Sequence, residues 1–153
     1  MAHAVSRPSG AGACLVLLLL LSAGANSPSP ELSVGGTYST RVTLLTDSNT
    51  CGEVTVEDAP TSVAHTPGAT KLSVTHAGNS YPGTIDVTGG FATTPTIVRG
   101  NGSEFTITIT GRFRRTGFDA TVRVEVQQPT PPRSCSYTVR WVGTKDGPPN
   151  VIP

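Results

Sequence analysis

Two neighbouring stretches decide the fold class: EFTITITGRF at residues 104–113 and FDATVRVEV at residues 118–126. In both, apolar and polar side chains alternate with a period of two, which is the pattern of a β-strand with one buried face. The first stretch places four apolar side chains on one face: Phe105, Ile107, Ile109 and Phe113. A short turn near Thr116-Gly117 separates the two stretches, so they predict an antiparallel hairpin.

Similar segments run through most of the chain, each bounded by Gly, Pro, Asn or Asp. They lie at 38–45, 53–66 (interrupted at Ala59-Pro60), 71–76, 81–87, 91–98 and 135–142. Each has one apolar and one polar face, which is typical of antiparallel sheets around a single core. We therefore predict an all-β domain, an antiparallel meander of about eight strands, for which a closed barrel is favoured over a β-sandwich.

The N-terminus has the features of a secretory signal peptide. Arg7 precedes an apolar run at residues 11–25 that is too short to span a bilayer. The run ends in Ala23-Gly24-Ala25, small residues of the kind that a signal peptidase recognises. We expect cleavage after Ala25, which removes Cys14 and leaves a mature protein without a transmembrane segment. The protein is then secreted, or periplasmic if the source is a Gram-negative bacterium.

The mature chain divides into three parts. Removal of 25 of the 153 residues leaves about 128, a length that suits one domain. Residues 26–35 are rich in Pro and Ser and predict a flexible leader, and residues 146–153 form a Pro/Gly-rich C-terminal tail. The β pattern fills residues 36–145, which we expect to form a single all-β domain.

Cys51 and Cys135 are the cysteines that remain after cleavage, and an oxidising compartment favours a disulfide between them. Free thiols at both positions are the alternative. Cys51 lies just past the first expected strand, and Cys135 opens the last one. In a closed meander the first and last strands are antiparallel neighbours, so closure requires the two cysteines to meet, whereas a sandwich only permits it.

Short glycine-containing sequences mark several strand ends. Gly36-Thr37-Tyr38 opens the first strand, and Gly78-Asn79-Ser80-Tyr81 and Gly89-Gly90-Phe91 form turns. With these sequences, the short meander resembles lipocalin-like (calycin-type) small secreted domains. The resemblance implies a β-barrel that carries a small ligand.

Composition and motifs argue against several classes of function. The formal net charge is +1 and charged residues make up 14% of the chain, so the dense Lys/Arg footprint of a nucleic-acid binder is missing. No Gly-x-Ser-x-Gly motif occurs, and only His65 and His76 remain after cleavage. The same histidines, with Glu57 and Asp58, match no metal-ligand spacing. We predict a protein that is not an enzyme and that has no metal site or cofactor.

Four arginines occupy outward positions of the last three expected strands: Arg112, Arg114, Arg123 and Arg140. They form either a basic stripe for an anionic glycan or lipid headgroup, or cross-strand ion pairs with the interleaved Asp119 and Glu125.

Inward-facing rings provide the candidate binding residues. An eight-stranded barrel is just wide enough to be filled by side chains or to hold one small ligand. The candidate ligand-binding residues are Tyr38, His76, Tyr81, Phe105, Phe113, Tyr137 and Trp141. Our first hypothesis is an exported, non-enzymatic β-barrel that binds a small apolar or amphipathic ligand. The alternative is a structural or protein-interaction module, a filled barrel or Ig-like sandwich with a protein partner and no small-molecule ligand.

Overall fold

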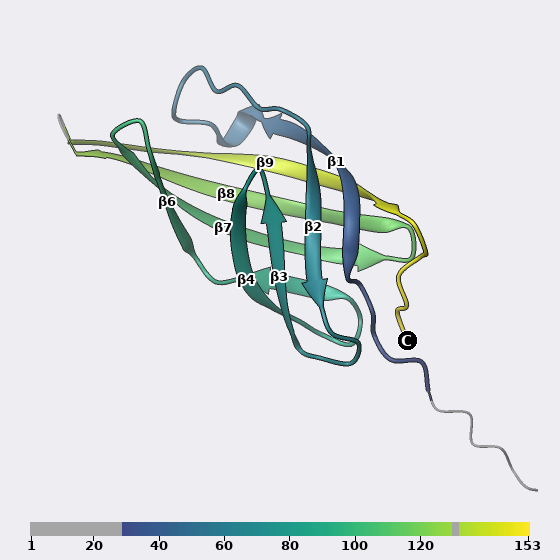
Figure 1. Ribbon diagram of the computed structural model, residues 1–153. Helices are drawn as coiled ribbons and strands as arrows, with labels where there is room; N and C mark the ends of the chain where they lie inside the picture. Colours follow the sequence, from purple (N-terminus) through teal and green to yellow (C-terminus); the bar gives the residue numbers. More distant parts are fainter. Residues whose placement is uncertain (1–28, 130–131) are drawn as a thin grey trace, which may run out of the picture.

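The structure of the protein, a computed structural model, describes residues 29–129 and 132–153; the expected signal peptide, residues 1–25, lies outside them. Nine strands form one antiparallel sheet in the order β5-β4-β3-β2-β1-β9-β8-β7-β6 (Figure 1). The strands are β1 (Gly36–Leu45), β2 (Ala59–His65), β3 (Lys71–His76), β4 (Asn79–Ile85), β5 (Gly90–Thr93), β6 (Thr96–Gly100), β7 (Ser103–Arg114), β8 (Gly117–Pro129) and β9 (Pro132–Asp146). The short 3-10 helix η1 (Thr46–Ser48) follows β1, and no helix of the described ranges has the length and apolarity needed to cross a membrane.

The sheet closes on itself. Because β5 pairs with β7 as well as with β4, eight of the nine strands form a ring, and β6 stands outside it, paired with β7. The first and last strands are antiparallel neighbours, from Thr37 opposite Asp146 to Leu45 opposite Thr138. The closed antiparallel barrel that the sequence favoured is confirmed.

Cys51 and Cys135 form the predicted disulfide, with their Cα atoms 5.0 Å apart. Thr50 strengthens the same contact: its backbone N–H donates to the carbonyl oxygen of Ser136 at 2.8 Å, and the Ser136 N–H donates to Thr50 Oγ1 at 2.8 Å. The loop between β1 and β2 is therefore fixed against β9 beyond the point where β1 ends.

Two expected strands differ from those observed. The segment expected at 53–66 is a strand only from Ala59 onward, because the residues before it belong to the loop that the disulfide holds. The segment expected at 91–98 is divided at Thr94-Pro95 into β5 and β6. There the Thr94 N–H donates to the carbonyl oxygen of Pro82 at 2.8 Å, which holds the corner against β4.

Both ends of the described chain close one end of the barrel, which we call the termini end. Leu32 and Val34 are buried, and Ser33 and Val151 exchange two backbone hydrogen bonds of 2.9 Å. The buried Asn150 side chain donates to the carbonyl oxygen of Arg114 at 2.7 Å. These residues lie in the parts expected to be a leader and a tail, so the packed unit extends beyond 36–145 on both sides.

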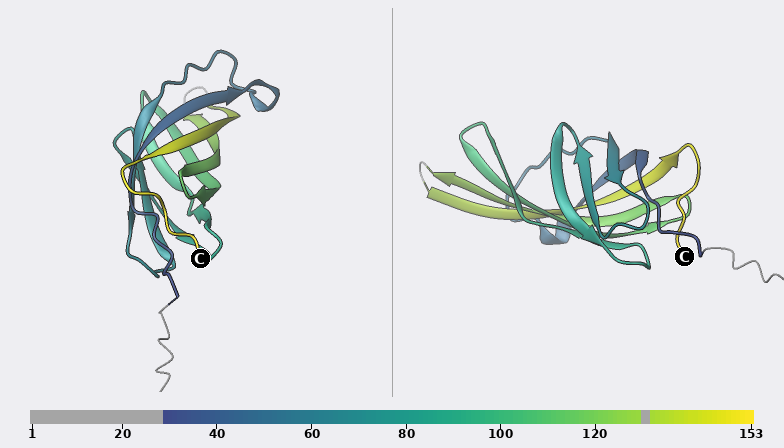
Figure 2. Two further views of the ribbon diagram at one scale, coloured as in Figure 1. Left: turned by 90° about the vertical axis from the view of Figure 1, so that its right-hand side faces the viewer. Right: turned by 60° about the horizontal axis from the view of Figure 1, so that its bottom comes forward.

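At the other end of the barrel, the far end, three strands continue past the rim. β1 ends opposite Thr138, whereas β9 runs on to Pro132 with β8 and β7 beside it. Together with β6, these segments form a curved sheet that projects from the barrel (Figure 2), and we call it the extension. It consists of β6 with residues 103–107 of β7, 124–129 of β8 and 132–137 of β9.

Candidate functional site

Four aromatic rings fill the termini end of the barrel, and we call them the aromatic plug: Tyr38, Phe91, Phe113 and Phe118. Ring centroids lie 4.8 Å apart between Phe91 and Phe113 and 5.2 Å apart between Tyr38 and Phe118. The Tyr38 hydroxyl lies 2.5 Å from the carbonyl oxygen of Val34 and 2.8 Å from Asn150 Oδ1. Burial raises the pKa of Tyr38 far above its ordinary value. A plug this tightly packed leaves its rings no room for a ligand.

In the middle of the barrel, hydrogen bonds connect the side chains of Thr40, Thr61 and His76, which we call the polar relay, and the His76 ring packs against Trp141. Thr40 Oγ1 and Thr61 Oγ1 are 2.8 Å apart, and Thr61 Oγ1 is 2.9 Å from His76 Nδ1. The His76 ring lies against the Trp141 indole, with a centroid distance of 4.0 Å and an interplanar angle of 31°. Burial lowers the pKa of His76, so its imidazole is neutral at neutral pH and has one donor and one acceptor nitrogen.

Three polar atoms of this region have no hydrogen-bond partner among the described residues. Among the described residues, every side-chain nitrogen or oxygen that is shut off from solvent has a hydrogen-bond partner. His76 Nε2 and the hydroxyls of Tyr81 and Tyr137 have no partner in the described chain, so each keeps contact with solvent. Burial raises the pKa of both tyrosines, and for Tyr81 the nearby Tyr137 contributes as well. The two hydroxyls and the imidazole thus offer neutral hydrogen-bonding groups at the far end.

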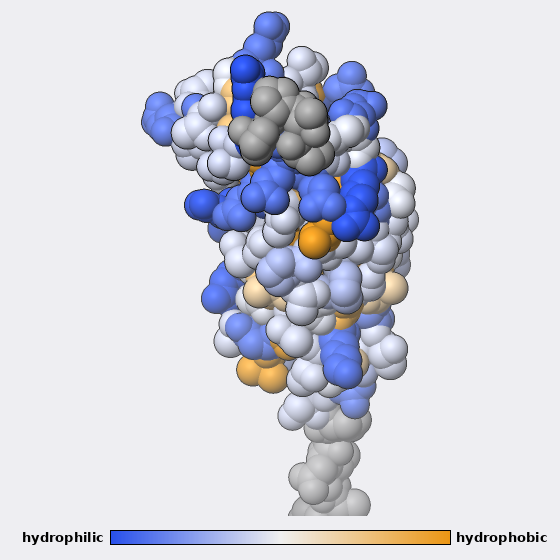
Figure 3. Space-filling model, turned by 90° about the vertical axis from the view of Figure 1, so that its left-hand side faces the viewer, coloured by the Kyte–Doolittle hydropathy of each residue, from blue (hydrophilic) through white to orange (hydrophobic). Residues whose placement is uncertain are grey.

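Apolar side chains of the extension, of β1 and of the β1–β2 loop lie at this end of the core. Half-buried residues pack against the core: Phe105, Ile107 and Tyr137 on the extension, Val42 and Leu44 on β1, and Val56 in the loop. Figure 3, which shows the left-hand side of Figure 1 where the extension projects, has mostly neutral and hydrophilic side chains with small hydrophobic areas between them. No broad hydrophobic patch is therefore visible at this end of the molecule.

The structure separates the predicted binding residues into two groups. Five of them lie toward the far end and form what we call the far-end site: His76, Tyr81, Phe105, Tyr137 and Trp141. Tyr38 and Phe113 belong instead to the aromatic plug, with exposed fractions of 0% and 2%. Sequence reasoning did not identify Thr61, because its place beside His76 depends on the β2–β3 register and not on any local pattern.

The second histidine has a structural role. His65 Nδ1 accepts a hydrogen bond from the Val34 N–H at 3.4 Å, and its Nε2 lies 2.9 Å from the carbonyl oxygen of Ala69. It therefore ties the N-terminal segment and the β2–β3 loop together. Within residues 29–129 and 132–153, no three His, Cys, Asp or Glu side chains come together in a way that could hold a metal ion.

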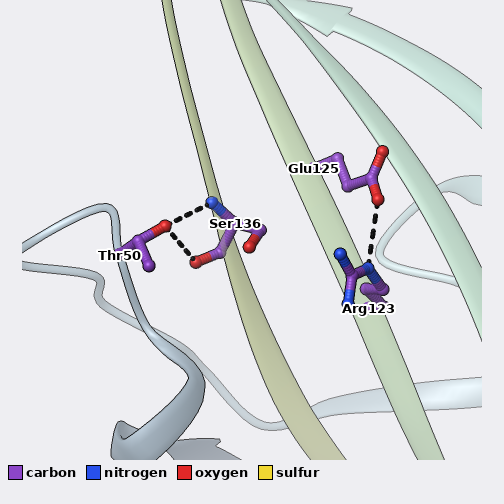
Figure 4. A network of polar contacts seen from close by, with 4 residues as sticks. All are labelled: Thr50, Arg123, Glu125 and Ser136. Carbon is purple, nitrogen blue, oxygen red and sulfur yellow. Dashed lines mark hydrogen bonds and ion pairs between the residues drawn. The ribbon is translucent and has the colours of Figure 1, made fainter.

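On the outer surface, most of the interleaved charges are paired. Arg140 bonds to Asp119, and Arg123 Nε lies 3.1 Å from Glu125 Oε1 (Figure 4). Arg112 donates to the carbonyl oxygen of Thr88 at 3.0 Å. Only the Arg140–Asp119 pair joins two strands, β9 and β8, because Arg123 and Glu125 both belong to β8. Three of the four arginines thus have a polar partner, which argues against a free basic stripe.

Compared with known proteins, the chain matches no protein-family model, no curated protein and no solved structure.

Proposed function

We propose that the protein is an exported, non-enzymatic β-barrel that binds a small apolar or amphipathic molecule at its far-end site. The observation that carries the proposal is the set of three solvent-contacting polar atoms, on His76, Tyr81 and Tyr137, within an otherwise apolar wall. A mostly apolar site with a few convergent polar groups is the usual design of a small-molecule site. The resemblance to lipocalin-like domains agrees with it.

The aromatic plug limits the depth of such a site. A ligand would stop at the level of His76 and Trp141, with its apolar body against Phe105 and Ile107 and its polar group at the tyrosine hydroxyls. The wall has no charged side chain among the buried or half-buried residues named above, which favours a neutral polar group such as a hydroxyl or carbonyl. Export is supported by the signal-like N-terminus and by the disulfide.

The geometry of the relay supports a role without catalysis. Thr61 is the hydroxyl nearest to an imidazole nitrogen, an arrangement that can activate a nucleophile. Its exposed fraction, however, is 0%, and its oxygen is shared between Thr40 and His76. A hydroxyl so enclosed cannot reach a substrate.

The test uses the fluorescence of Trp141, the single tryptophan of the chain. Retinol, which carries one hydroxyl, should quench its emission saturably, and native mass spectrometry of the secreted protein should find a co-purifying small molecule. Loss of both hydroxyls in a Tyr81→Phe/Tyr137→Phe variant should weaken retinol binding about tenfold, the value of one hydrogen bond. Tyr38→Phe is the matched control, and it should leave binding unchanged.

Absence of quenching by retinol and by oleate, together with a protein that carries no small molecule, would refute the proposal. The alternative, an interaction module without a small-molecule ligand, would then take its place.

A further inference from the structure

The strand β6 leaves the barrel with one edge unpaired. A two-residue turn joins it to β7, and the turn residues Asn101 and Gly102 have φ values of 51° and 72°, as in a type I′ hairpin. In such a hairpin the pair that closes the turn, here Gly100 and Ser103, exchanges two hydrogen bonds, and every second pair beyond it does the same. Alternate residues of β6 therefore point their backbone groups away from β7.

The register identifies these residues. Val98 lies opposite Phe105 and Thr96 opposite Ile107, so both bond to β7, and Ile97 and Arg99 direct their N–H and C=O groups outward. β7 provides an independent check: Ile109 and Phe113, odd-numbered like Phe105, donate toward the β5 side, to Thr93 Oγ1 and to the carbonyl oxygen of Gly89. No described residue hydrogen-bonds to the backbone of Ile97 or Arg99.

The two edges of the extension differ in how they are protected. The β9 edge is held by the disulfide and by Thr50, which bonds to Ser136. The β6 edge is open, and the side chain of Ile97 is 56% exposed there. An unpaired edge with an exposed apolar residue is a template for an added strand.

The surroundings of β6 restrict what can occupy this edge. β5 joins β4 to β7 at the foot of β6, so β4 stands on the side that the free edge faces (Figure 1). A folded partner that added its own edge strand to β6 would bring further strands behind it, and these would meet β4. A single extended segment needs only the distance between two neighbouring strands, about 4.8 Å. The space therefore favours a single extended segment over a second folded copy of this chain.

Side chains next to the edge define the chemistry of the segment. Val98 shares the inner face with Phe105, so the segment should present apolar side chains inward. Arg99 is on the outer face and uses only its Nε toward Glu104, at 2.7 Å, which leaves its terminal nitrogens for another carboxylate. The segment should therefore carry an acidic residue outward.

We propose that the free edge of β6 binds an extended segment of another polypeptide, with alternating inward apolar and outward acidic residues, as an added β-strand through Ile97 and Arg99. The interaction surface is distinct from the far-end site.

The probe is the synthetic peptide DATVRVEVQ, the sequence of residues 119–127, in which apolar residues alternate with polar ones and two of the polar residues are acidic. In the free protein, amide exchange by NMR should be fast at Ile97 and Arg99 and slow at Val98 and Gly100. The peptide should slow exchange at Ile97 and Arg99, whereas a version with proline in place of its central arginine should not. Trp141 emission should stay unchanged, which separates this result from small-molecule binding.

Ile97→Pro removes the outward N–H but none of the bonds to β7, and it should weaken peptide binding at least about tenfold. Ile97→Thr keeps the N–H and is the matched control, expected to bind like the parent. In each variant, slow exchange at Val98 shows that β6 still pairs with β7. If Ile97→Pro disrupts this pairing, Arg99→Pro is used in its place. Three results would overturn the proposal. The peptide does not slow exchange at Ile97 and Arg99, or the Ile97→Pro protein binds the peptide as tightly as the parent does. The third is that raising the concentration of the protein, without peptide, slows exchange at these two residues.

Discussion

Removing one hydroxyl from each of the three tyrosines should produce unequal losses of stability. The chain contains three tyrosines: Tyr38 and Tyr81 are buried in the barrel, and Tyr137 is half-buried on the inner face of the extension. Only the Tyr38 hydroxyl has hydrogen-bond partners among the described residues. The same chemical change, Tyr→Phe, therefore distinguishes a hydroxyl with buried partners from two that have none among the described residues.

The magnitude follows from what each variant leaves behind. Tyr38→Phe leaves Asn150 Oδ1 buried without its partner, whereas the carbonyl oxygen of Val34 keeps a contact with Lys145 Nζ. One buried acceptor without a partner costs about 1–3 kcal/mol. Tyr81→Phe and Tyr137→Phe break no bond to a described residue, and we expect each to change the free energy of unfolding by less than about 0.5 kcal/mol.

Urea unfolding followed by Trp141 emission measures all three variants in one assay. With a slope of about 2 kcal/mol per molar urea, the Tyr38→Phe midpoint should fall by roughly 0.5–1.5 M, and the other two midpoints should stay close to that of the parent. If Tyr38→Phe were as stable as the parent, the hydrogen bonds of the plug would not hold the termini end closed. A loss at Tyr81 or Tyr137 as large as at Tyr38 would show that these hydroxyls have partners, and the far-end site would need another interpretation.

Three further perturbations have defined outcomes. Reduction of the Cys51–Cys135 bond should cost about 4–5 kcal/mol, because it releases a loop of 84 residues in the unfolded chain, and the melting temperature should fall with it. Burial lowers the pKa of His76, so stability should decrease as the pH falls below about 6.5, by at most about 1.4 kcal/mol per unit, and His76→Gln should remove this dependence in urea titrations. Trp141→Ala should cost about 3–5 kcal/mol if the indole is fully packed, and less if it borders a ligand space.

The fold could be predicted because the patterns that specify its strands lie within short stretches of the sequence. Alternation along Glu104–Phe113 and Phe118–Val126 predicted the hairpin and its buried face, and in the structure β7 and β8 form that hairpin, with Phe113 opposite Phe118. The cysteine positions added one long-range constraint, and it was sufficient for closure because β1 and β9 pair directly.

The far-end site was only partly predictable, since an inward position does not reveal the depth at which a side chain lies. Phe105 and Phe113 have the same phase on β7, but Phe113 packs into the plug and Phe105 remains half-buried on the extension. The strand offsets around the barrel set this depth, and they are fixed by pairings such as Thr61 with His76 that leave no pattern in the sequence. The packing of residues 32–34 and 150–152 was equally hidden, because a single buried Asn between prolines and glycines has no periodicity.

The corner at Thr94-Pro95 links the two proposed interactions. β5 closes the ring through three residue pairs with β7, from Gly90 opposite Arg112 to Ala92 opposite Thr110. Beyond the corner, Pro95 has no N–H to continue the pairing, and β6 pairs with β7 alone, which leaves the outward backbone groups of Ile97 and Arg99 unpaired. A continuous strand from β5 through β6 would have closed the wall to the rim. The break in that strand therefore leaves the extension its free edge, and we attribute to the same break the access that the proposed far-end site requires.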